Sequence, residues 1–127
     1  MPSRWKKTTA LNKKTALRLR KSLQWKKVRD ATAEAVWETY DINPDELWSP
    51  RRYEEVAFCR QVVYYTLYRK FGLTSSLVGR ILGKDHGTIL YGTDRIEGFM
   101  EVDPTLRRDI KLLVQRIEEK VEATELL

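Results

Sequence analysis

Four consecutive residues, an acid, a histidine, a glycine and a threonine, stand between a glycine turn and an apolar run. Their carboxylate, imidazole and hydroxyl groups can form hydrogen bonds with base edges or phosphates, and a threonine methyl can contact a thymine methyl. In a helix-turn-helix, the side chains that contact bases lie at the N-terminal end of the second helix. We therefore predict a group of base contacts, called the reader cluster below, at Asp85, His86, Gly87 and Thr88.

Other chemistry is poorly supported by the residue types. His86 is the one histidine and Cys59 the one cysteine, so neither a His/Cys metal cluster nor a catalytic triad can be assembled. The lone cysteine excludes an intrachain disulfide, and its apolar neighbours favour a buried free thiol. The alternative for His86 is a helix-capping or surface histidine. We expect no enzyme activity, no cofactor and no metal.

Two short helices joined by a tight turn would place the reader cluster at a helix start. Thr74 or Ser75 can cap the first helix through a hydroxyl oxygen, and Gly83 can end it in the left-handed conformation. The second helix is predicted to begin at Lys84 or Asp85. A helix-glycine-helix pattern is also common in helical proteins that bind no DNA. Apolar residues fall near helical spacing at Leu77, Val78, Ile81 and Leu82, and then at Ile89, Tyr91 or Gly92, Ile96 and Phe99.

Periodicity elsewhere predicts an all-α fold, because glycine and proline are few and no alternating strand pattern recurs. A single turn should follow Pro44, and the longest strong helix should span residues 53–71, with Tyr64, Tyr65 and Tyr68 in the core. A further helix is predicted over residues 31–40, with Ala33, Val36, Trp37 and Tyr40 facing inward.

Arg60 and Gln61 interrupt the apolar pattern of the predicted 53–71 helix. One interpretation is a phosphate contact from Arg60, since arginine is a common phosphate ligand in protein–DNA complexes. The other is an arginine whose stem packs on the helix while its charge reaches solvent, beside a solvated glutamine.

A C-terminal helix is predicted over residues 104–125, with Asp103 as its cap and Pro104 at its first position. Its apolar residues form a stripe close to a heptad seam, barely two and a half heptads long. The stripe could pack on its own domain, giving a monomer, or pair with a second copy in a homodimer with two reading heads. The stripe consists of Leu106, Ile110, Leu113, Ile117 and Val121.

The net charge of +6 conceals a strong asymmetry along the chain. Residues 1–29 hold eleven of the 24 basic residues and no acid, whereas the rest of the chain holds 13 basic and 18 acidic residues. A block of one sign repels itself and favours a polyanionic partner. We therefore divide the chain into a basic arm, residues 1–30, and a helical domain, residues 31–127. The basic residues of the arm are Arg4, Lys6, Lys7, Lys13, Lys14, Arg18, Arg20, Lys21, Lys26, Lys27 and Arg29.

Three interpretations fit the arm. It could follow a phosphate backbone, with Trp5 and Trp25 lying on sugars or bases. It could be a solvated helix face, although such faces usually mix charges, or a membrane-surface helix, which would need a larger apolar face. No apolar stretch approaches the roughly 20 residues of a membrane span, and no secretory signal follows the N-terminus. We expect a protein of the cytoplasm.

The order and spacing of these residues resemble the C-terminal DNA-binding domain of the bacterial replication initiator DnaA. The resemblance covers about residues 33–100, and its most specific parts are Arg60-Gln61 and the run Gly-Lys-Asp-His-x-Thr at residues 83–88. It also includes residues 36–40, the segment Asp-Glu-Leu-Trp-Ser at residues 45–49, and the Arg-Arg pair that follows. It implies a compact helical domain, from a bacterium or a bacteriophage, that recognises a short site in double-stranded DNA.

Carried over residue by residue, the resemblance implies major-groove contacts from the reader cluster and further contacts from a basic loop and flanking helices. Two departures from the family pattern are Gly87, where a threonine is usual, and Glu54, where a second loop arginine is frequent. They leave room for an alternative, a module that binds RNA or an acidic protein and no longer recognises bases. The implied phosphate and loop contacts are Arg51, Arg52, Arg60, Gln61, Ser76 and Lys84.

The family resemblance does not extend to ATPase chemistry. The 127 residues contain no Gly-x-x-x-x-Gly-Lys-Ser/Thr loop and leave no room for the initiator's nucleotide-binding domain. We therefore expect a non-enzymatic module that acts in replication control or transcription regulation.

Overall fold

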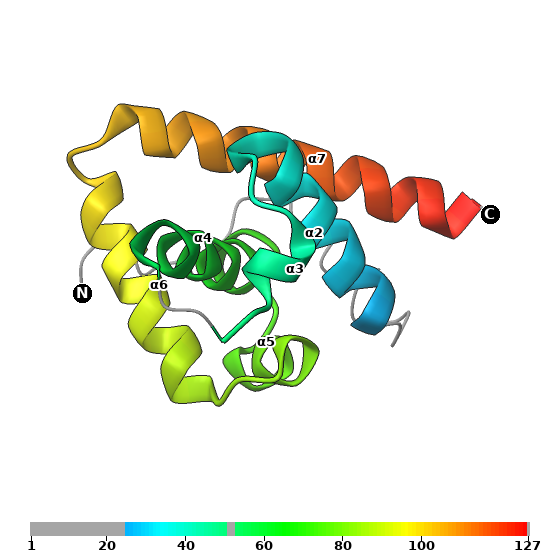
Figure 1. Ribbon diagram of the computed structural model, residues 1–127, viewed down its shortest axis with the longest axis horizontal. Helices are drawn as coiled ribbons and strands as arrows, with labels where there is room; N and C mark the ends of the chain where they lie inside the picture. Colours follow the sequence, from blue (N-terminus) through cyan, green and yellow to red (C-terminus); the bar gives the residue numbers. More distant parts are fainter. Residues whose placement is uncertain (1–24, 51–52, 127) are drawn as a thin grey trace.

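The computed structural model describes residues 25–50 and 53–126, and every regular element within these ranges is a helix (Figure 1). This confirms the predicted all-α fold. The π-helical segment η2 continues α4 without a break, so the helix predicted over residues 53–71 is present over residues 54–70. It is not the longest helix, since α7 has 23 residues. The elements are α2 (Trp25–Tyr40), α3 (Pro44–Leu47), α4 (Glu54–Tyr65), η2 (Thr66–Lys70), α5 (Ser75–Leu82), α6 (His86–Met100) and α7 (Pro104–Leu126).

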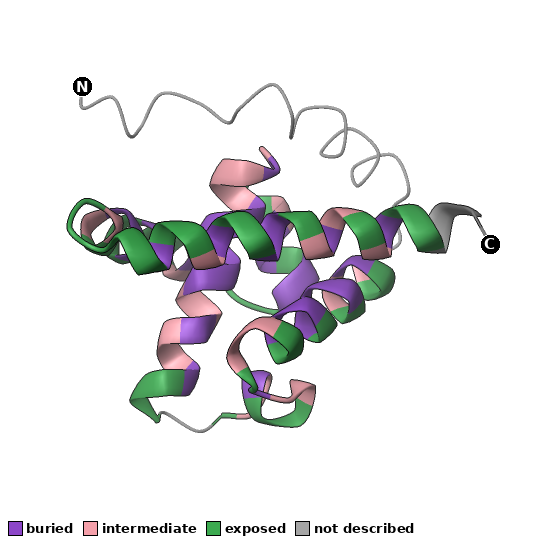
Figure 2. Cartoon of the chain, turned by 90° about the horizontal axis from the view of Figure 1, so that it is seen from above, coloured by how far each residue is buried: buried purple, intermediate pink, exposed green. Residues whose placement is uncertain are grey.

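The core lies between the inward faces of these helices, with α4 packed mainly on α6 and α2 on α7. Figure 2 shows the buried residues as stripes along the facing sides of the helices. On α4 and η2 the buried stripe includes Tyr64 and Tyr65, as predicted, whereas Tyr68 is half-buried at its edge. Cys59 is a buried free thiol. The largest fully buried side chains include Phe71, Leu47, Leu67, Leu73, Ile89, Ile96, Ile110, Leu113 and Ile117.

A close approach of backbone and side chain joins α4 to α6 at Gly92. A Cβ atom at this position would lie 2.7 Å from Cδ2 of Tyr64, well inside van der Waals contact. An ion pair at the other end of the same interface links Arg69 Nε on η2 to Glu97 Oε1 on α6 over 3.3 Å. Because Glu97 is buried, this pair ties the two elements together in a low-dielectric setting. These two contacts fix the orientation of α6 relative to α4.

Helix α2 differs from the sequence prediction at one aromatic residue. The spacing predicts Trp37 in the core, but this residue is 50% exposed, and the prediction was wrong. The helix begins at Trp25 in the described chain, and its buried stripe runs through Val28, Ala31, Thr32, Ala35 and Val36 at helical spacing, so residue 37 falls beyond the edge of the stripe. The boundary expected between residues 30 and 31 lies inside this continuous helix.

Helix α7 begins at the predicted cap, since Asp103 Oδ1 accepts hydrogen bonds from the backbone N–H groups of Thr105 and Leu106. All five residues of the predicted stripe, Leu106 to Val121, are buried within their own chain. Polar contacts hold α7 across α2: Lys120 Nζ lies 2.7 Å from Glu38 Oε2, and Arg116 donates to Thr39 Oγ1. The stripe therefore packs on its own domain.

Candidate nucleic-acid interface

The turn between α5 and α6 is held by contacts that require its glycines. Thr74 caps α5, because its Oγ1 accepts a hydrogen bond from Leu77 N at 3.1 Å. Gly83 ends α5 with a φ of 70°, the left-handed conformation predicted for it. Lys84 N then donates to Gly79 O at 2.8 Å, and a Cβ atom on Gly79 would collide with the carbonyl oxygen of Lys84. This packing sets the geometry between the two helices of the helix-turn-helix.

The reader cluster lies at the start of α6. Asp85 is the N-cap, and its Oδ1 accepts a hydrogen bond from Thr88 N at 2.8 Å. This hydrogen bond lowers the pKa of the Asp85 carboxyl below its ordinary value, so the group is ionised at neutral pH. His86 and Gly87 are exposed and Thr88 is half-buried, whereas Ile89 is fully buried and anchors the helix below them.

The position of this helix start suits contact with a large partner. Figure 1 shows α5 and the start of α6 at one end of the molecule, with α7 crossing the opposite side. Lys84 is exposed just before the cap, and Ser76 is exposed in the first turn of α5. The exposed groups here comprise a cation, a carboxylate and an imidazole, which can act on phosphates and on base edges.

The two residues of the predicted Arg-Gln pair point to different elements. The Arg60 guanidinium donates from Nε to Leu47 O at 2.6 Å and from Nη2 to the carbonyl oxygen of Ser49. It thus binds the carbonyl groups at the end of α3, a role that neither sequence interpretation included. Gln61 is half-buried and packs under α6, since its Cγ would lie 3.1 Å from a Cβ atom on Gly92.

Several predicted contacts fall outside the described residues. Of the basic arm, Lys26 and Lys27 are exposed on the first turn of α2, and the Arg29 guanidinium lies 4.9 Å from the centre of the Trp48 ring. The loop contacts Arg51 and Arg52 lie outside the described residues. So do the remaining basic residues of the arm: Arg4, Lys6, Lys7, Lys13, Lys14, Arg18, Arg20 and Lys21.

The outer face of α6 carries residues that the sequence interpretation did not include in the interface. Leu90 is 40% exposed and Tyr91 is 62% exposed, one turn beyond the reader cluster. The Arg95 guanidinium lies 6.0 Å from the centre of the Tyr91 ring and 5.5 Å from that of Phe99. The sequence left Tyr91 and Gly92 as alternatives for the core; Ile89, Gly92 and Ile96 are buried, which places Tyr91 outside.

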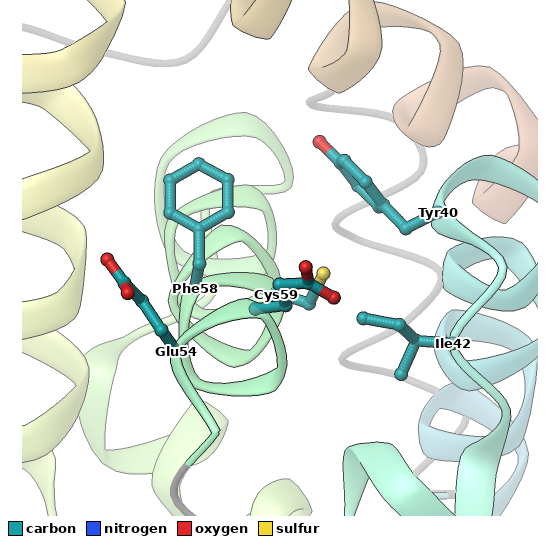
Figure 3. Close-up of a pocket in the computed structure, with 6 residues that line it drawn as sticks. Tyr40, Ile42, Glu54, Phe58 and Cys59 are labelled. Atoms are coloured by element: carbon teal, nitrogen blue, oxygen red, sulfur yellow. The ribbon is translucent and has the colours of Figure 1, made fainter.

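A cleft of about 520 Å³ lies between α4 and the end of α2, and none of the described residues that line it is a predicted DNA contact. Figure 3 shows Phe58 and Glu54 of α4 on one side of Cys59, and Tyr40 and Ile42 on the other side. Two of its lining residues, Glu54 and Glu55, are carboxylates, which repel phosphates. Within the described ranges, no group of His, Cys, Asp and Glu side chains is arranged to hold a metal, and no helix is long and apolar enough to cross a membrane.

Comparison with known proteins agrees with this geometry. A family model described as the bacterial DnaA protein helix-turn-helix matches residues 30–96, more than half of the chain. Similar curated proteins include chromosomal replication initiator proteins DnaA from Thermomicrobium roseum, 33% identical over 90 residues, and Lachnoclostridium phytofermentans, 28% identical over 89 residues. These matches cover 70% and 69% of this chain. They cover 19% and 20% of the two relatives, so the chain spans about a fifth of their length. The chain belongs to the bacterial DnaA helix-turn-helix family.

Proposed function

We propose that this chain binds double-stranded DNA with a preference for a particular sequence, with the start of α6 placed in the major groove. The observation that carries the proposal is the reader cluster: a capped, exposed helix start with charged and polar groups, held by a turn that packs directly on α5. A major groove about 12 Å wide admits an α-helix, and its base edges present distinct donor and acceptor patterns.

The individual contacts follow from the chemistry of the cluster. The ionised Asp85 carboxylate can accept from a cytosine amino group, and the Thr88 methyl can contact a thymine methyl. Lys84 and the basic arm add contacts to phosphates, which position the protein and strengthen binding without specifying a sequence. The module itself is non-enzymatic in this proposal.

The cellular process is proposed from the relatives, whose printed names describe initiators of chromosomal replication. A chain carrying their helix-turn-helix could occupy related sites in a bacterial cytoplasm, of bacterial or bacteriophage origin, and so act in replication control or transcription regulation. Because the match covers about a fifth of these relatives, only the DNA-binding part of their activity is carried over.

Selection of bound duplexes from a random DNA pool tests the proposal. At about 150 mM salt, screening weakens binding that depends on the backbone alone. We expect one enriched motif, and variants His86→Ala and Thr88→Ala should each lose about 1–3 kcal/mol on it while binding to random duplex is nearly unchanged. Leu112→Ala is the matched control, because Leu112 is exposed on α7, at the opposite side.

Two results would contradict sequence recognition. Equal losses on the selected and the random duplex would make His86 and Thr88 general binding residues. Displacement of the duplex by an equal mass of RNA, without any enriched DNA motif, would favour the alternative RNA-binding module.

A further inference from the structure

The reader cluster has a gap at Gly87. This residue is exposed and carries no side chain, and the space where a Cβ atom would stand contains only Asp85 Oδ1, 3.3 Å away. A recognition helix with a gap in this position lacks one contact to the bases that its first turn faces. Any side chain at residue 87 would also crowd the carboxylate that caps the helix.

Tyr91 lies on the same face of α6, four residues further along. Side chains at positions i and i+4 of a helix share a face, and they lean toward the N-terminus, so a residue covers the surface one turn before its own Cα atom. The surface above Gly87 is therefore the surface that a side chain at residue 91 reaches. Tyr91 is 62% exposed, which leaves its ring accessible to a partner.

Arg95 supports the ring from the other side, again one turn along the same face. Its guanidinium lies 6.0 Å from the centre of the Tyr91 ring, within the range of a cation–π contact. The three residues thus form a row along α6 from Gly87 through Tyr91 to Arg95. The positive charge of Arg95 can therefore make a cation–π contact with the Tyr91 ring.

We propose that Tyr91 is a specificity-determining residue that contacts the base edges a side chain at position 87 would otherwise reach. The inference rests on the proposed DNA binding and adds a residue and a chemistry to it. The exposed edge of an aromatic ring makes apolar contact with the C5-methyl group of thymine, a contact that distinguishes thymine from cytosine in the major groove. In this proposal the Tyr91 ring contacts the C5-methyl group of a thymine, and Arg95 positions the Tyr91 ring.

The test uses the full chain and the motif selected by the wild-type protein. Four proteins are compared: wild type, Tyr91→Ala, Gly87→Thr and the double variant. Dissociation constants are measured on the motif, on duplexes in which each thymine is replaced in turn by deoxyuridine, and on random duplex. Since deoxyuridine lacks only the C5-methyl group, it isolates the proposed contact. Thermal unfolding of each variant confirms that it is folded.

Tyr91→Ala should weaken binding to the motif about tenfold and leave random duplex unchanged. Wild type should lose affinity at one particular deoxyuridine, and Tyr91→Ala should be indifferent to it. Gly87→Thr should weaken binding more when Tyr91 is present than when it is absent, because both side chains need the same space. We expect this coupling to be at least about threefold. The control pair is Gly87→Thr with Leu112→Ala, because Leu112 is exposed on α7, and the two effects should multiply independently.

Two outcomes overturn the inference alone: Tyr91→Ala selects the same motif with the same affinity, or its effect multiplies independently with that of Gly87→Thr. In either case the enriched motif of the wild type still stands, and the proposed function with it. If wild type enriches no motif at all, the proposed function fails first, and the assignment of Tyr91 fails with it.

Discussion

The carboxylate of Asp85 accepts a hydrogen bond from the backbone N–H of Thr88 over 2.8 Å, so two members of the reader cluster are bonded to each other. The cap holds the first turn of α6 in its helical form, which fixes where His86 and Thr88 stand relative to the core. Part of the proposed DNA-contact surface is therefore ordered by the protein itself, which would lower the entropy cost of binding a duplex.

This cap gives stability a definite pH dependence. The folded pKa of Asp85 lies below its ordinary value near 3.8, so its contribution is fully present above that pH and is lost as the pH falls through the lower folded pKa. Thermal unfolding of wild type and Asp85→Ala should therefore differ at neutral pH and converge in strong acid. Asp85→Asn can still cap the helix at every pH, so its stability should exceed that of Asp85→Ala by a constant amount. A difference of constant size between wild type and Asp85→Ala at every pH would contradict this assignment.

A second prediction concerns the glycine that packs in the turn. Gly79→Ala should lower the free energy of unfolding by about 1–3 kcal/mol or more, because the added methyl meets a backbone carbonyl that cannot move aside. Gly98→Ala is the matched control: nothing lies within 4 Å of its Cβ position, and alanine in a helix should stabilise by about 0.4–1 kcal/mol. Urea unfolding of both variants decides, and equal effects would contradict the close packing of the turn.

The contacts of Arg60 predict that it acts by positioning the segment at the end of α3. Arg60→Ala should lower the free energy of unfolding by about 1.5–3 kcal/mol, since hydrogen bonds from a charged group are lost. Arg60→Lys should be nearly as unstable, because lysine keeps the charge but lacks the planar fork. The slope of log affinity against log salt should be unchanged in both variants. A slope smaller by about 1 in Arg60→Ala alone would instead establish a direct phosphate contact.

Removal of residues 1–24 should test the basic arm. The deletion takes away eight basic residues and no acid. If the arm follows phosphates, the slope of log affinity against log salt should fall by several units, at most about 7, while the enriched motif stays the same. A chain that keeps its slope but selects a different motif would show that the arm contacts bases rather than the backbone.

Local signals in the sequence were sufficient for the helix-turn-helix. Caps and stops depend on residues close in sequence, so Gly83 and Asp103 were identified by residue type alone and are confirmed. For the cap of α5, residue type left Thr74 and Ser75 as alternatives, and the structure has Thr74. The all-α fold and the buried stripe of α7 followed from periodicity in the same way. These features need no knowledge of how the helices cross.

Features that depend on packing between distant elements could not be predicted. The face that Trp37 occupies depends on where α2 begins and how α7 crosses it, and the 31–40 window alone placed it inward. Arg60 binds carbonyl groups eleven to fourteen residues earlier, a contact that no local spacing reveals. The helical spacing alone could not decide whether Tyr91 or Gly92 is buried. Gly92 packs against Tyr64, and Tyr91, the residue before it, is therefore exposed.

Because Cys59 is buried, the rate at which its thiol is labelled can report transient opening of the core. Cys59 is 3% exposed, and burial raises the pKa of its thiol to about 12. The reactive thiolate is therefore scarce while the core is intact. Because it is the one cysteine, the rate at which a maleimide modifies it reports how often the helices around α4 separate. If a duplex bound at α6 stabilises the fold, it should slow this labelling. The labelling rate of Cys59 would then report DNA binding at a distant site.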